Sequence, residues 1–157
     1  MIAATPISLA VRADAPAIAV LSRDAIERGL PWRWTPAHVM RAIDDRNTNV
    51  AVAREGEALL GFGIMHYSRD DAAHLQLLAV RADRRRSGVG SALLVWLEAV
   101  ARVAGLARIG LEARLDNVAG RSFYSEHGYH EKCIVARMYS GRLDGVRMMK
   151  WLRAASP

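Results

Sequence analysis

The stretch Arg85-Arg86-Ser87-Gly88-Val89-Gly90 decides how this chain is interpreted, because it lies between an apolar run and an amphipathic run. The preceding run, Leu75 to Val80, is typical of a buried strand, and the following run, Ser91 to Val103, has helical spacing. Glycines permit a tight turn and a close approach of the backbone to a ligand, while free amides at a helix start attract anions. The stretch therefore predicts a phosphate-binding loop between a strand and a helix.

Two common phosphate-binding motifs do not fit this loop. Gly88 and Gly90 are followed by Leu93 where the dinucleotide fingerprint needs a third glycine, and a Gly-Lys-Ser or Gly-Lys-Thr of the Walker type is absent. The loop instead resembles the Arg/Gln-x-x-Gly-x-Gly/Ala signature of the GNAT superfamily of acetyltransferases, which Arg85, Gly88 and Gly90 match.

A second resemblance to this superfamily lies downstream. Its Asn-x-x-Ala-x-x-Phe/Leu-Tyr-x-x-x-Gly-Phe helix is similar to the pattern formed by Asn117, Gly120, Phe123, Tyr124, Gly128 and Tyr129, with glycine in place of the alanine. Three further segments look like the subgroup of ribosomal-protein-alanine N-acetyltransferases: Pro31-Trp32, Leu111 to Arg114, and Arg137 to Met148. A second tryptophan, Trp34, departs from that subgroup.

Length and composition predict one domain over residues 1–157, since 52% of the residues are hydrophobic and no Pro- or Ser-rich stretch divides the chain. We expect a cytoplasmic protein without a membrane span, because the chain has neither a basic segment followed by an apolar one near its start nor a long apolar run. The single cysteine, Cys133, is expected to be a small packing residue. The five histidines lack a convincing ligand spacing, so no metal is expected.

The net charge of +6 is compatible with nucleic acid, an acidic cofactor or a solvated surface. Arg81, Arg84, Arg85 and Arg86 gather on the predicted loop, which favours the phosphates of coenzyme A over the alternative of an exposed turn. No nucleic-acid-binding motif accompanies the charge, so nucleic acid is not expected as a partner.

The periodic segments predict a mixed, mostly antiparallel sheet of about seven strands flanked by about four helices, the α/β architecture that the resemblance also implies. Strands are expected near residues 7–11, 49–54, 59–67, 74–80, 108–114, 129–139 and 146–152, with turns at Glu55-Gly56-Glu57 and around Ser140-Gly141 and Asp144-Gly145. Helices are expected after a cap at Asp14, from Thr35-Pro36 to about Ile43, after Gly90, and after a cap at Asn117.

The family resemblance implies how acetyl-CoA binds. The backbone of three strand residues, Leu78, Ala79 and Val80, is expected to hold the pantetheine arm and the thioester carbonyl. The pyrophosphate and neighbouring groups would contact Arg85, Arg86, Ser87, Gly88, Val89, Gly90, Ser91 and Asn117. Gly120 and Tyr124 share one stripe of the last helix, where a glycine would leave room for the arm; the alternative is a capped helix with a packed tyrosine.

Acetyl transfer from a thioester requires a neutral amine and a proton for the departing thiolate. Tyr124 is the candidate general acid. Glu112, twelve residues earlier as in the similar subgroup, is the candidate base, unless it is only a solvated carboxylate between arginines. His74 and Gln76, which are expected to share a face with Leu78, could each hold a water that relays the proton, and His74 is the reserve base.

The resemblance implies an acetyl-CoA-dependent N-acetyltransferase that acts in one step within a ternary complex. A protein N-terminal α-amine is expected as the acceptor, because it loses its proton more readily than lysine; a small-molecule amine is the alternative. Trp32, Trp34 and Tyr139 either cover the acceptor or anchor the core. A non-catalytic acyl-CoA-binding module and a homodimer also remain open.

Overall fold

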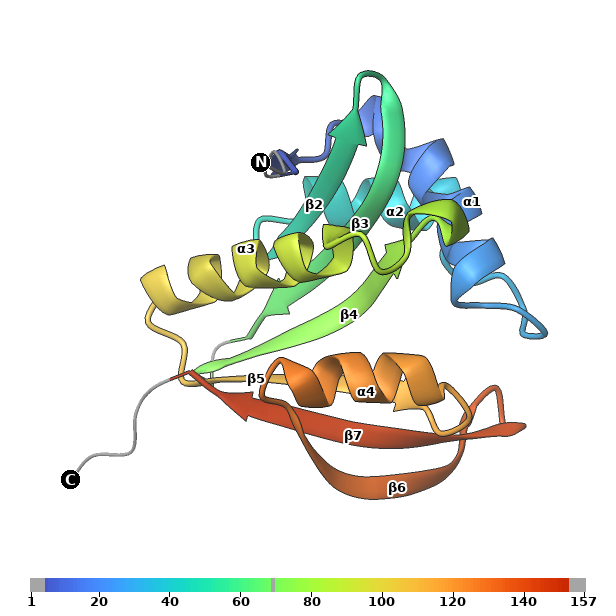
Figure 1. The fold of residues 1–157 in the computed structure, drawn as a ribbon, viewed down its shortest axis with the longest axis vertical. Helices are drawn as coiled ribbons and strands as arrows, with labels where there is room; N and C mark the ends of the chain where they lie inside the picture. Colours follow the sequence, from blue (N-terminus) through green and yellow to red (C-terminus); the bar gives the residue numbers. More distant parts are fainter. Residues whose placement is uncertain (1–4, 69, 153–157) are drawn as a thin grey trace.

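The computed structural model describes residues 5–68 and 70–152, and within them a single seven-stranded sheet runs through the molecule (Figure 1). Its strands are β1 (Ile7–Leu9), β2 (Thr48–Glu55), β3 (Ala58–Tyr67), β4 (Ala72–Val80), β5 (Arg108–Arg114), β6 (His130–Tyr139) and β7 (Leu143–Trp151). The spatial order is β1-β2-β3-β4-β5-β7-β6, and every neighbouring pair is antiparallel except β4 and β5. The predicted mixed, mostly antiparallel sheet is confirmed.

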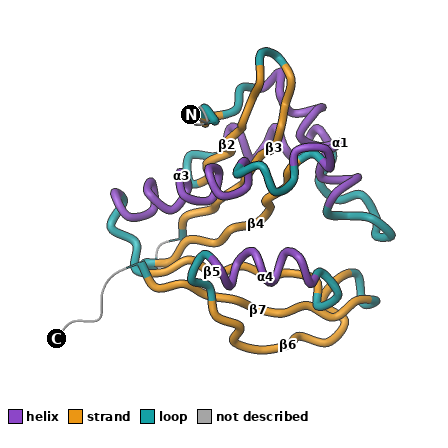
Figure 2. The backbone as a smooth tube through the Cα atoms, in the orientation of Figure 1, coloured by secondary structure: helices purple, strands orange, loops and turns teal. Residues whose placement is uncertain are grey.

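Four α-helices in the described residues cover this sheet, and their number agrees with the prediction. They are α1 (Ala15–Ala25), α2 (Pro36–Asp44), α3 (Val89–Val103) and α4 (Val118–Glu126), with short 3-10 turns at Arg12–Asp14 and Ala82–Arg84. Helices α1 and α2 lie behind β2 and β3, α3 crosses in front of them, and α4 lies over β5 and β7 (Figure 2). None of the described helices is long and apolar enough to cross a membrane.

The two faces of the sheet bury separate hydrophobic cores. The α3 face includes Leu93, Leu94 and Leu97, all fully buried, and extends to the partly buried rings of α4. The opposite face packs α1 and α2 against the sheet through side chains such as Ile18 and Val39. Burial of this kind contributes roughly 1.5–3 kcal/mol per large aliphatic side chain, so the two layers hold the central strands rigidly.

Strands β4 and β5 separate partway along their length. They pair from Ala72, opposite Arg108, only as far as Leu75, opposite Leu111. Beyond that point β4 turns away from β5, and the divergence is visible in Figures 1 and 2. The edge of β4 from Gln76 to Val80 therefore has no strand partner on this side, which leaves backbone groups facing the gap.

A bulge lies at the same place and corrects one prediction. In the β3–β4 ladder Ile64 pairs with Leu77 while the next residue of β3 pairs with Leu75, so Gln76 is an extra residue. Leu75 and Leu78 consequently both pack on the α3 face. The expectation that Leu78 shares a face with His74 and Gln76 is therefore wrong, whereas Gln76 does open to the α2 side on which His74 lies.

Local signals gave mixed results at the helix starts. Thr35 caps α2, its hydroxyl accepting from the amide of His38 at 3.3 Å, as predicted. Asp14 directly precedes α1, but its carboxylate makes no cap; it accepts from the amide of Val11 at 2.8 Å and from Arg54 instead. The predicted cap is wrong because a distant cation offers the carboxylate a stronger partner.

Two predictions near the end of the chain also need correction. Asp144 and Gly145 are part of β7 and not of a turn, because Gly145 pairs with Arg114 on one side and with Val135 on the other. Cys133 is exposed on the edge strand β6 and does not pack in the core. The apolar neighbours of Cys133 suggested burial, but β6 lies at the edge of the sheet, where its side chains are open to solvent.

Candidate active site

The carboxylate of Glu112 lies at the point where β4 and β5 separate, between a histidine and an arginine. Its Oε2 hydrogen-bonds Nε2 of His74 on β4. Its Oε1 lies 3.6 Å from Nε of Arg147, the residue opposite it on β7. The hydrogen bond from His74 lowers the pKa of Glu112, outweighing burial, and the charges of His74 and Arg147 lower it further. Glu112 is therefore ionised and fixed by two side-chain partners, which differs from the alternative of a solvated carboxylate between arginines of the same strand.

One tyrosine, Tyr139, lies within electrostatic reach of this carboxylate, and a second, Tyr124, lies within reach of Tyr139. Tyr139, at the end of β6, is partly buried, and burial together with the charge of Glu112 raises its pKa to about 12. Tyr124 of α4 is partly buried against the α3-side core, and burial followed by the neighbouring Tyr139 raises its pKa well above the ordinary value. Both phenols stay protonated at neutral pH, so each can donate a proton or a hydrogen bond.

The loop between α1 and α2 is held beside this group by a buried carboxylate. Glu27, 8% exposed, accepts from the hydroxyl of Ser22 at 3.0 Å and from the amides of Arg33 and Trp34 at 2.7 and 3.1 Å. These bonds fix a loop that would otherwise leave amides unsatisfied. The guanidinium of Arg114 at the end of β5 donates to the carbonyl of Arg28 in the same loop at 2.9 Å.

The aromatic residues of this loop have different surroundings. The ring of Trp34 stacks on the imidazole of His38, with centroids 3.8 Å apart, and packs partly against the α1–α2 core. Trp32 is 37% exposed and donates through Nε1 to the carbonyl of Ala19 at 3.2 Å. Trp34 thus has the anchoring role, whereas Trp32 presents part of its ring at the surface.

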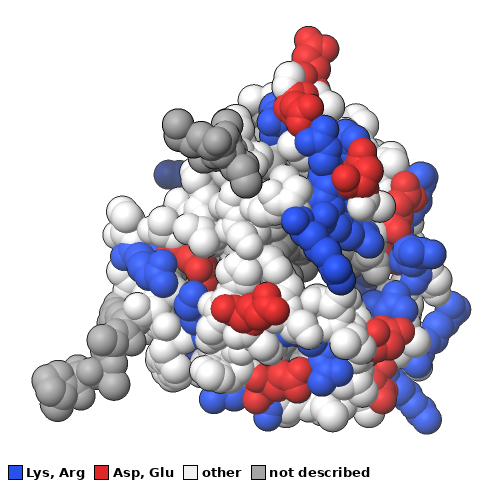
Figure 3. Space-filling model, viewed as in Figure 1, with Lys and Arg blue, Asp and Glu red and all other residues white. Residues whose placement is uncertain are grey.

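The predicted anion loop leads from β4 into α3. Gly88 immediately precedes the helix with φ of 90°, and Arg86 also has a positive φ of 60°. The first amides of the helix, those of Val89, Gly90 and Ser91, have no acceptor within the helix itself. Basic side chains gather over this loop near the centre of the view (Figure 3). The predicted strand, glycine-containing turn and helix are present, and the binding of an anion there stays a prediction.

Only part of the arginine cluster is available for an anion. Arg81 pairs with Asp83 at 2.6 Å, and Arg84 pairs with Glu55 at 2.5 Å. Among the described residues no ion pair involves Arg85 or Arg86. Arg85 and Arg86, the two arginines expected to contact the pyrophosphate, are thus the members of the cluster without an ion pair in the described structure.

The end of β4, the start of α3 and helix α4 meet around Gly90. A β-carbon at this position would lie 3.5 Å from the ring of Phe123 and 3.6 Å from Val80. The imidazole of His127, just after α4, bonds the hydroxyl of Ser91 at 2.9 Å. Leu78, Ala79 and Val80 thus lead directly from the strand gap toward the predicted anion loop. The hydroxyl of Ser87 instead turns back to the carbonyl of Arg84.

Asn117 caps α4, its Oδ1 accepting from the amide of Gly120 at 3.0 Å. A β-carbon on Gly120 would lie 2.4 Å from Nδ2 of Asn117. The space next to this glycine is therefore filled by the cap itself, and the expectation that Gly120 leaves room for a ligand chain is corrected. Asn117 keeps only its Nδ2 for another partner.

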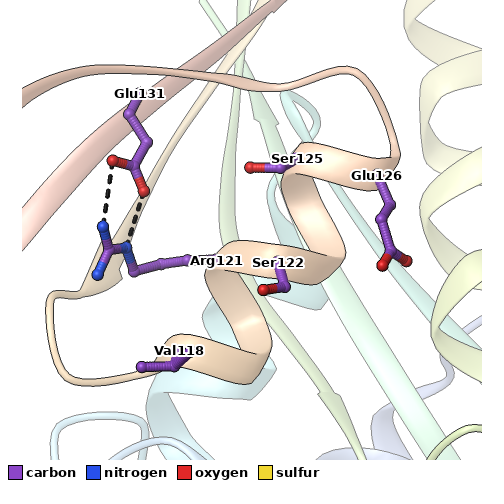
Figure 4. Close-up of a pocket in the computed structure, with 6 residues that line it drawn as sticks. All are labelled: Val118, Arg121, Ser122, Ser125, Glu126 and Glu131. Carbon is purple, nitrogen blue, oxygen red and sulfur yellow. Dashed lines mark hydrogen bonds and ion pairs between the residues drawn. The ribbon is translucent and has the colours of Figure 1, made fainter.

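Two hollows open on the surface. One, of about 400 Å³, lies on the outer side of α4, where Arg121 and Glu131 form an ion pair and Glu126 is the other charged residue of the lining (Figure 4). The other, of about 250 Å³, lies between α2 and the sheet and reaches Gln76. The second adjoins the strand gap, so it is the one relevant to Glu112. No group of three or more potential metal-ligating side chains occurs in residues 5–68 and 70–152.

Two residues of this region were not identified from the sequence. Arg147 stands opposite Glu112 only because of the β5–β7 register, which no local signal encodes. His127 contacts Ser91 across thirty-six residues. An antiparallel pairing of the Glu112 and Arg147 segments could have suggested the first; nothing in the sequence indicates the second.

Comparison with known proteins gives consistent matches. Residues 17–129 match the family described as "Acetyltransferase (GNAT) family". The [ribosomal protein bS18]-alanine N-acetyltransferase of Escherichia coli is 29% identical over 78% of this chain and 83% of its own length. The crystal structure of the E. coli ribosomal-protein-S18-alanine N-acetyltransferase superposes with a TM-score of 0.82 and 26% identity, covering 97% of this chain and 96% of that one.

Two further matches extend the comparison. An N-acetyltransferase of Methanocaldococcus jannaschii, itself uncharacterised, is 36% identical over 49% of this chain, and the matched part spans half of that relative. The PaiA N-acetyltransferase of Thermoplasma acidophilum, crystallised in complex with coenzyme A, has a TM-score of 0.78 over 93% of this chain and 98% of its own. At 16% identity the latter likeness concerns the fold alone.

Proposed function

This chain belongs to the acetyltransferase (GNAT) family, and we propose that it transfers the acetyl group of acetyl-CoA directly to a primary amine, with a protein N-terminal α-amine as the first candidate acceptor. The observation that carries the proposal is an ionised Glu112 where β4 and β5 separate, whose charge reaches Tyr139, together with a neutral Tyr124 that lies within electrostatic reach of Tyr139. Acetyl transfer needs both kinds of group and a donor site between them.

The donor would lie along the unpaired edge of β4. Backbone groups of Leu78, Ala79 and Val80 would hold the pantetheine arm and polarise the thioester carbonyl, and amides of Val89 to Ser91 with Arg85 and Arg86 would hold the pyrophosphate. The remaining groups proposed for this site are Ser87, Gly88 and the Nδ2 of Asn117. Two unpaired guanidinium groups and a helix start suit the negative charge of coenzyme A phosphates.

The chemistry follows from the protonation states. Glu112 directs deprotonation of the amine: its fixed negative charge favours binding of the ammonium next to a base that then takes the proton. Tyr124, kept neutral by burial, gives its proton to the departing sulfur. A raised phenol pKa makes this transfer unfavourable on its own, so the proton released by the attacking nitrogen must refill the phenol in the same event.

An α-amine is favoured over lysine because its ordinary pKa is about 2 units lower, so more of it is neutral at physiological pH. The E. coli relative is named for action on an alanine of ribosomal protein bS18, which supports a protein N-terminus as the acceptor class. A small-molecule amine is the leading alternative. A non-catalytic acyl-CoA-binding module is disfavoured by the presence of both Glu112 and Tyr124.

Incubation of the purified protein with acetyl-CoA and a mixed panel of acceptors tests the proposal. The panel contains peptides with free N-termini, N-terminally blocked lysine peptides, polyamines and small amines, and mass spectrometry reads the products. We expect acetylation of free N-terminal peptides. Product only from small amines would select the alternative, and coenzyme A binding without any product would favour the binding module.

A further inference from the structure

We propose that His74, and not Glu112 itself, receives the proton of the acceptor amine, with Glu112 positioning His74 and stabilising its charged form. The inference deepens the proposed function and rests on it. It arises from the hydrogen bond between Nε2 of His74 and Oε2 of Glu112, two side chains from adjacent parallel strands at the place where those strands separate.

The hydrogen bond determines which ring nitrogen is available. An ionised carboxylate can only accept, so Nε2 of His74 carries the hydrogen and Nδ1 presents a lone pair. No hydrogen bond to Nδ1 occurs within the described part of the chain, and 43% of the His74 side chain is exposed. The free nitrogen of an oriented imidazole is thus open to a ligand or to one bridging water.

The ring also faces the side from which an acceptor would approach. Ala73 and Leu75, its neighbours in β4, pack into the α3-side core. Successive side chains of a strand point to opposite faces, so His74 lies on the face covered by α1, α2 and the loop between them. The hollow that reaches Gln76 opens on this same side.

Glu112 is poorly suited to take the proton directly. Its pKa is lowered by the hydrogen bond from His74 and by the charge of Arg147, which makes the carboxylate a weaker base than an ordinary glutamate. Imidazole is the side chain that changes charge nearest neutral pH, and a carboxylate bonded to its second nitrogen stabilises the imidazolium. The pair therefore divides into a proton acceptor and a partner that orients it.

Other charged or titratable groups surround the pair from each neighbouring strand. His66 of β3 is the cross-strand partner of His74; its Nδ1 lies 3.1 Å from the hydroxyl of Thr48 and 3.9 Å from Asp45. Arg147 approaches from β7, and the phenol of Tyr139 is within reach of the Glu112 charge from β6. None of these groups combines a hydrogen bond to Glu112 with a second ring nitrogen that is available to a ligand, as His74 does.

In the proposed step the acetyl group moves from sulfur to nitrogen while the nitrogen loses two protons. Nδ1 of His74 takes one proton from the ammonium, and the freed lone pair of the amine forms the C–N bond with the thioester carbonyl carbon. The C–S bond breaks, its electron pair remains on sulfur, and sulfur takes the phenolic proton of Tyr124. The second proton of the nitrogen restores the phenol, and His74 releases its proton to water. One ammonium and one acetyl-CoA thus give one amide, one coenzyme A thiol and one proton.

The test compares pH profiles of kcat/KM for the full chain, measured with acetyl-CoA and the acceptor peptide that the panel selects. In the wild type, kcat/KM should rise with pH as the proton-accepting histidine loses its proton, and we call this rise the limb. In His74→Gln we expect kcat/KM to fall about 10²-fold and the limb to disappear. In Glu112→Gln we expect a smaller loss of kcat/KM with the limb retained, because His74 keeps its open ring nitrogen but loses the carboxylate that orients it. His66→Gln, on the same face one strand away, is the matched control and should keep both rate and limb.

Two further readouts separate a chemical role from a structural one. Coenzyme A affinity, measured by calorimetry, should stay within about threefold in all variants, which shows that they are folded. In His74→Ala, added imidazole should restore part of the rate. Retention of rate and limb in His74→Gln, or absence of imidazole rescue in a folded His74→Ala, would overturn the inference while leaving the proposed function intact. A wild-type protein that acetylates no amine would overturn both.

Discussion

The phenol of Tyr129 donates a 2.9 Å hydrogen bond to the carboxylate of Glu98 in the interior, where the two residues are 1% and 3% exposed. Lys150 approaches the same carboxylate at 3.0 Å. Burial and the charge of Glu98 raise the pKa of Tyr129, so its phenol remains a donor. The ring of Tyr129 meets that of Tyr124 edge-on at 5.8 Å, which joins this buried group to the candidate general acid.

Removal of that donor should destabilise the fold without changing the site. Tyr129→Phe keeps the ring against Tyr124 but leaves one oxygen of Glu98 without its donor, so we expect the free energy of unfolding to fall by about 1–3 kcal/mol in urea titrations. Tyr67→Phe is the matched control, because its partly buried phenol only accepts from Asn49 at 2.8 Å. Equal losses in the two variants would show that the buried carboxylate gains nothing special from Tyr129.

Tyr124→Phe addresses catalysis. The substitution keeps the ring in its partly buried place and removes only the hydroxyl, so coenzyme A affinity should change less than about threefold while kcat falls about 10²-fold. Single-turnover assays with acetyl-CoA measure the rate of the chemical step, and calorimetry measures coenzyme A affinity.

Tyr139→Phe serves as the control, because it removes a hydroxyl from the neighbouring phenol, the one that the charge of Glu112 reaches. A smaller drop is expected there, since Tyr139 comes from β6 and Tyr124 from the helix that contacts the anion loop near Gly90. If Tyr139→Phe lost more kcat than Tyr124→Phe, the general acid would have to be reassigned to Tyr139.

The arginines of the anion loop should differ in their effect on coenzyme A. Arg85→Ala and Arg86→Ala each remove a guanidinium without an ion pair in the described chain, so coenzyme A binding should weaken about tenfold and become less dependent on salt. Arg84→Ala removes one that Glu55 already neutralises, and affinity should stay nearly unchanged. Calorimetric titrations at two salt concentrations make the comparison. Equal losses in all three variants would mean that net charge alone, and not the free guanidinium groups, holds the ligand.

Much of the fold could be predicted because its signals are local. The strand Arg108–Arg114 was placed to the residue from its alternating residue pattern, and the caps at Thr35 and Asn117 follow from side-chain chemistry next to each helix. The bulge at Gln76 could not be predicted, since it depends on how β4 pairs with β3 and not on residue type. One inserted residue then reversed the face assigned to Leu78.

The candidate site was predictable to a smaller extent. The twelve-residue spacing and the family resemblance directed attention to Glu112 and Tyr124, whose roles stay predictions. The partners that set their protonation depend on register: His74 and Arg147 reach Glu112 from two different strands, 38 residues before it in one case. The ion pairs of Arg81 and Arg84 are likewise tertiary or conformational details that the loop sequence does not encode.

The ion pair between Asp14 and Arg54 should govern stability in acid. Burial alone would raise the pKa of Asp14, but the hydrogen bonds from Arg54 and from the amide of Val11, with the charge of Arg54, lower it below the ordinary value. A carboxylate whose folded pKa is depressed stabilises the fold above its unfolded pKa, and this contribution is lost as pH falls through the folded pKa. Asp14→Asn removes the charge of a nearly buried side chain and leaves Arg54 without its counter-ion. We therefore expect the free energy of unfolding to fall by about 2–4 kcal/mol at pH 7.

The difference between Asp14→Asn and the wild type should shrink as the pH is lowered from about 5 toward 2, because the wild-type carboxylate becomes protonated there. Asp44→Asn is the control: its pair with Arg12 is exposed, with 44% and 69% of the two side chains accessible, so solvent screens it and little change is expected. Urea titrations at each pH give the free energies of unfolding. A constant difference between Asp14→Asn and the wild type down to pH 2 would mean that the aspartate stabilises this corner through packing and not through its charge.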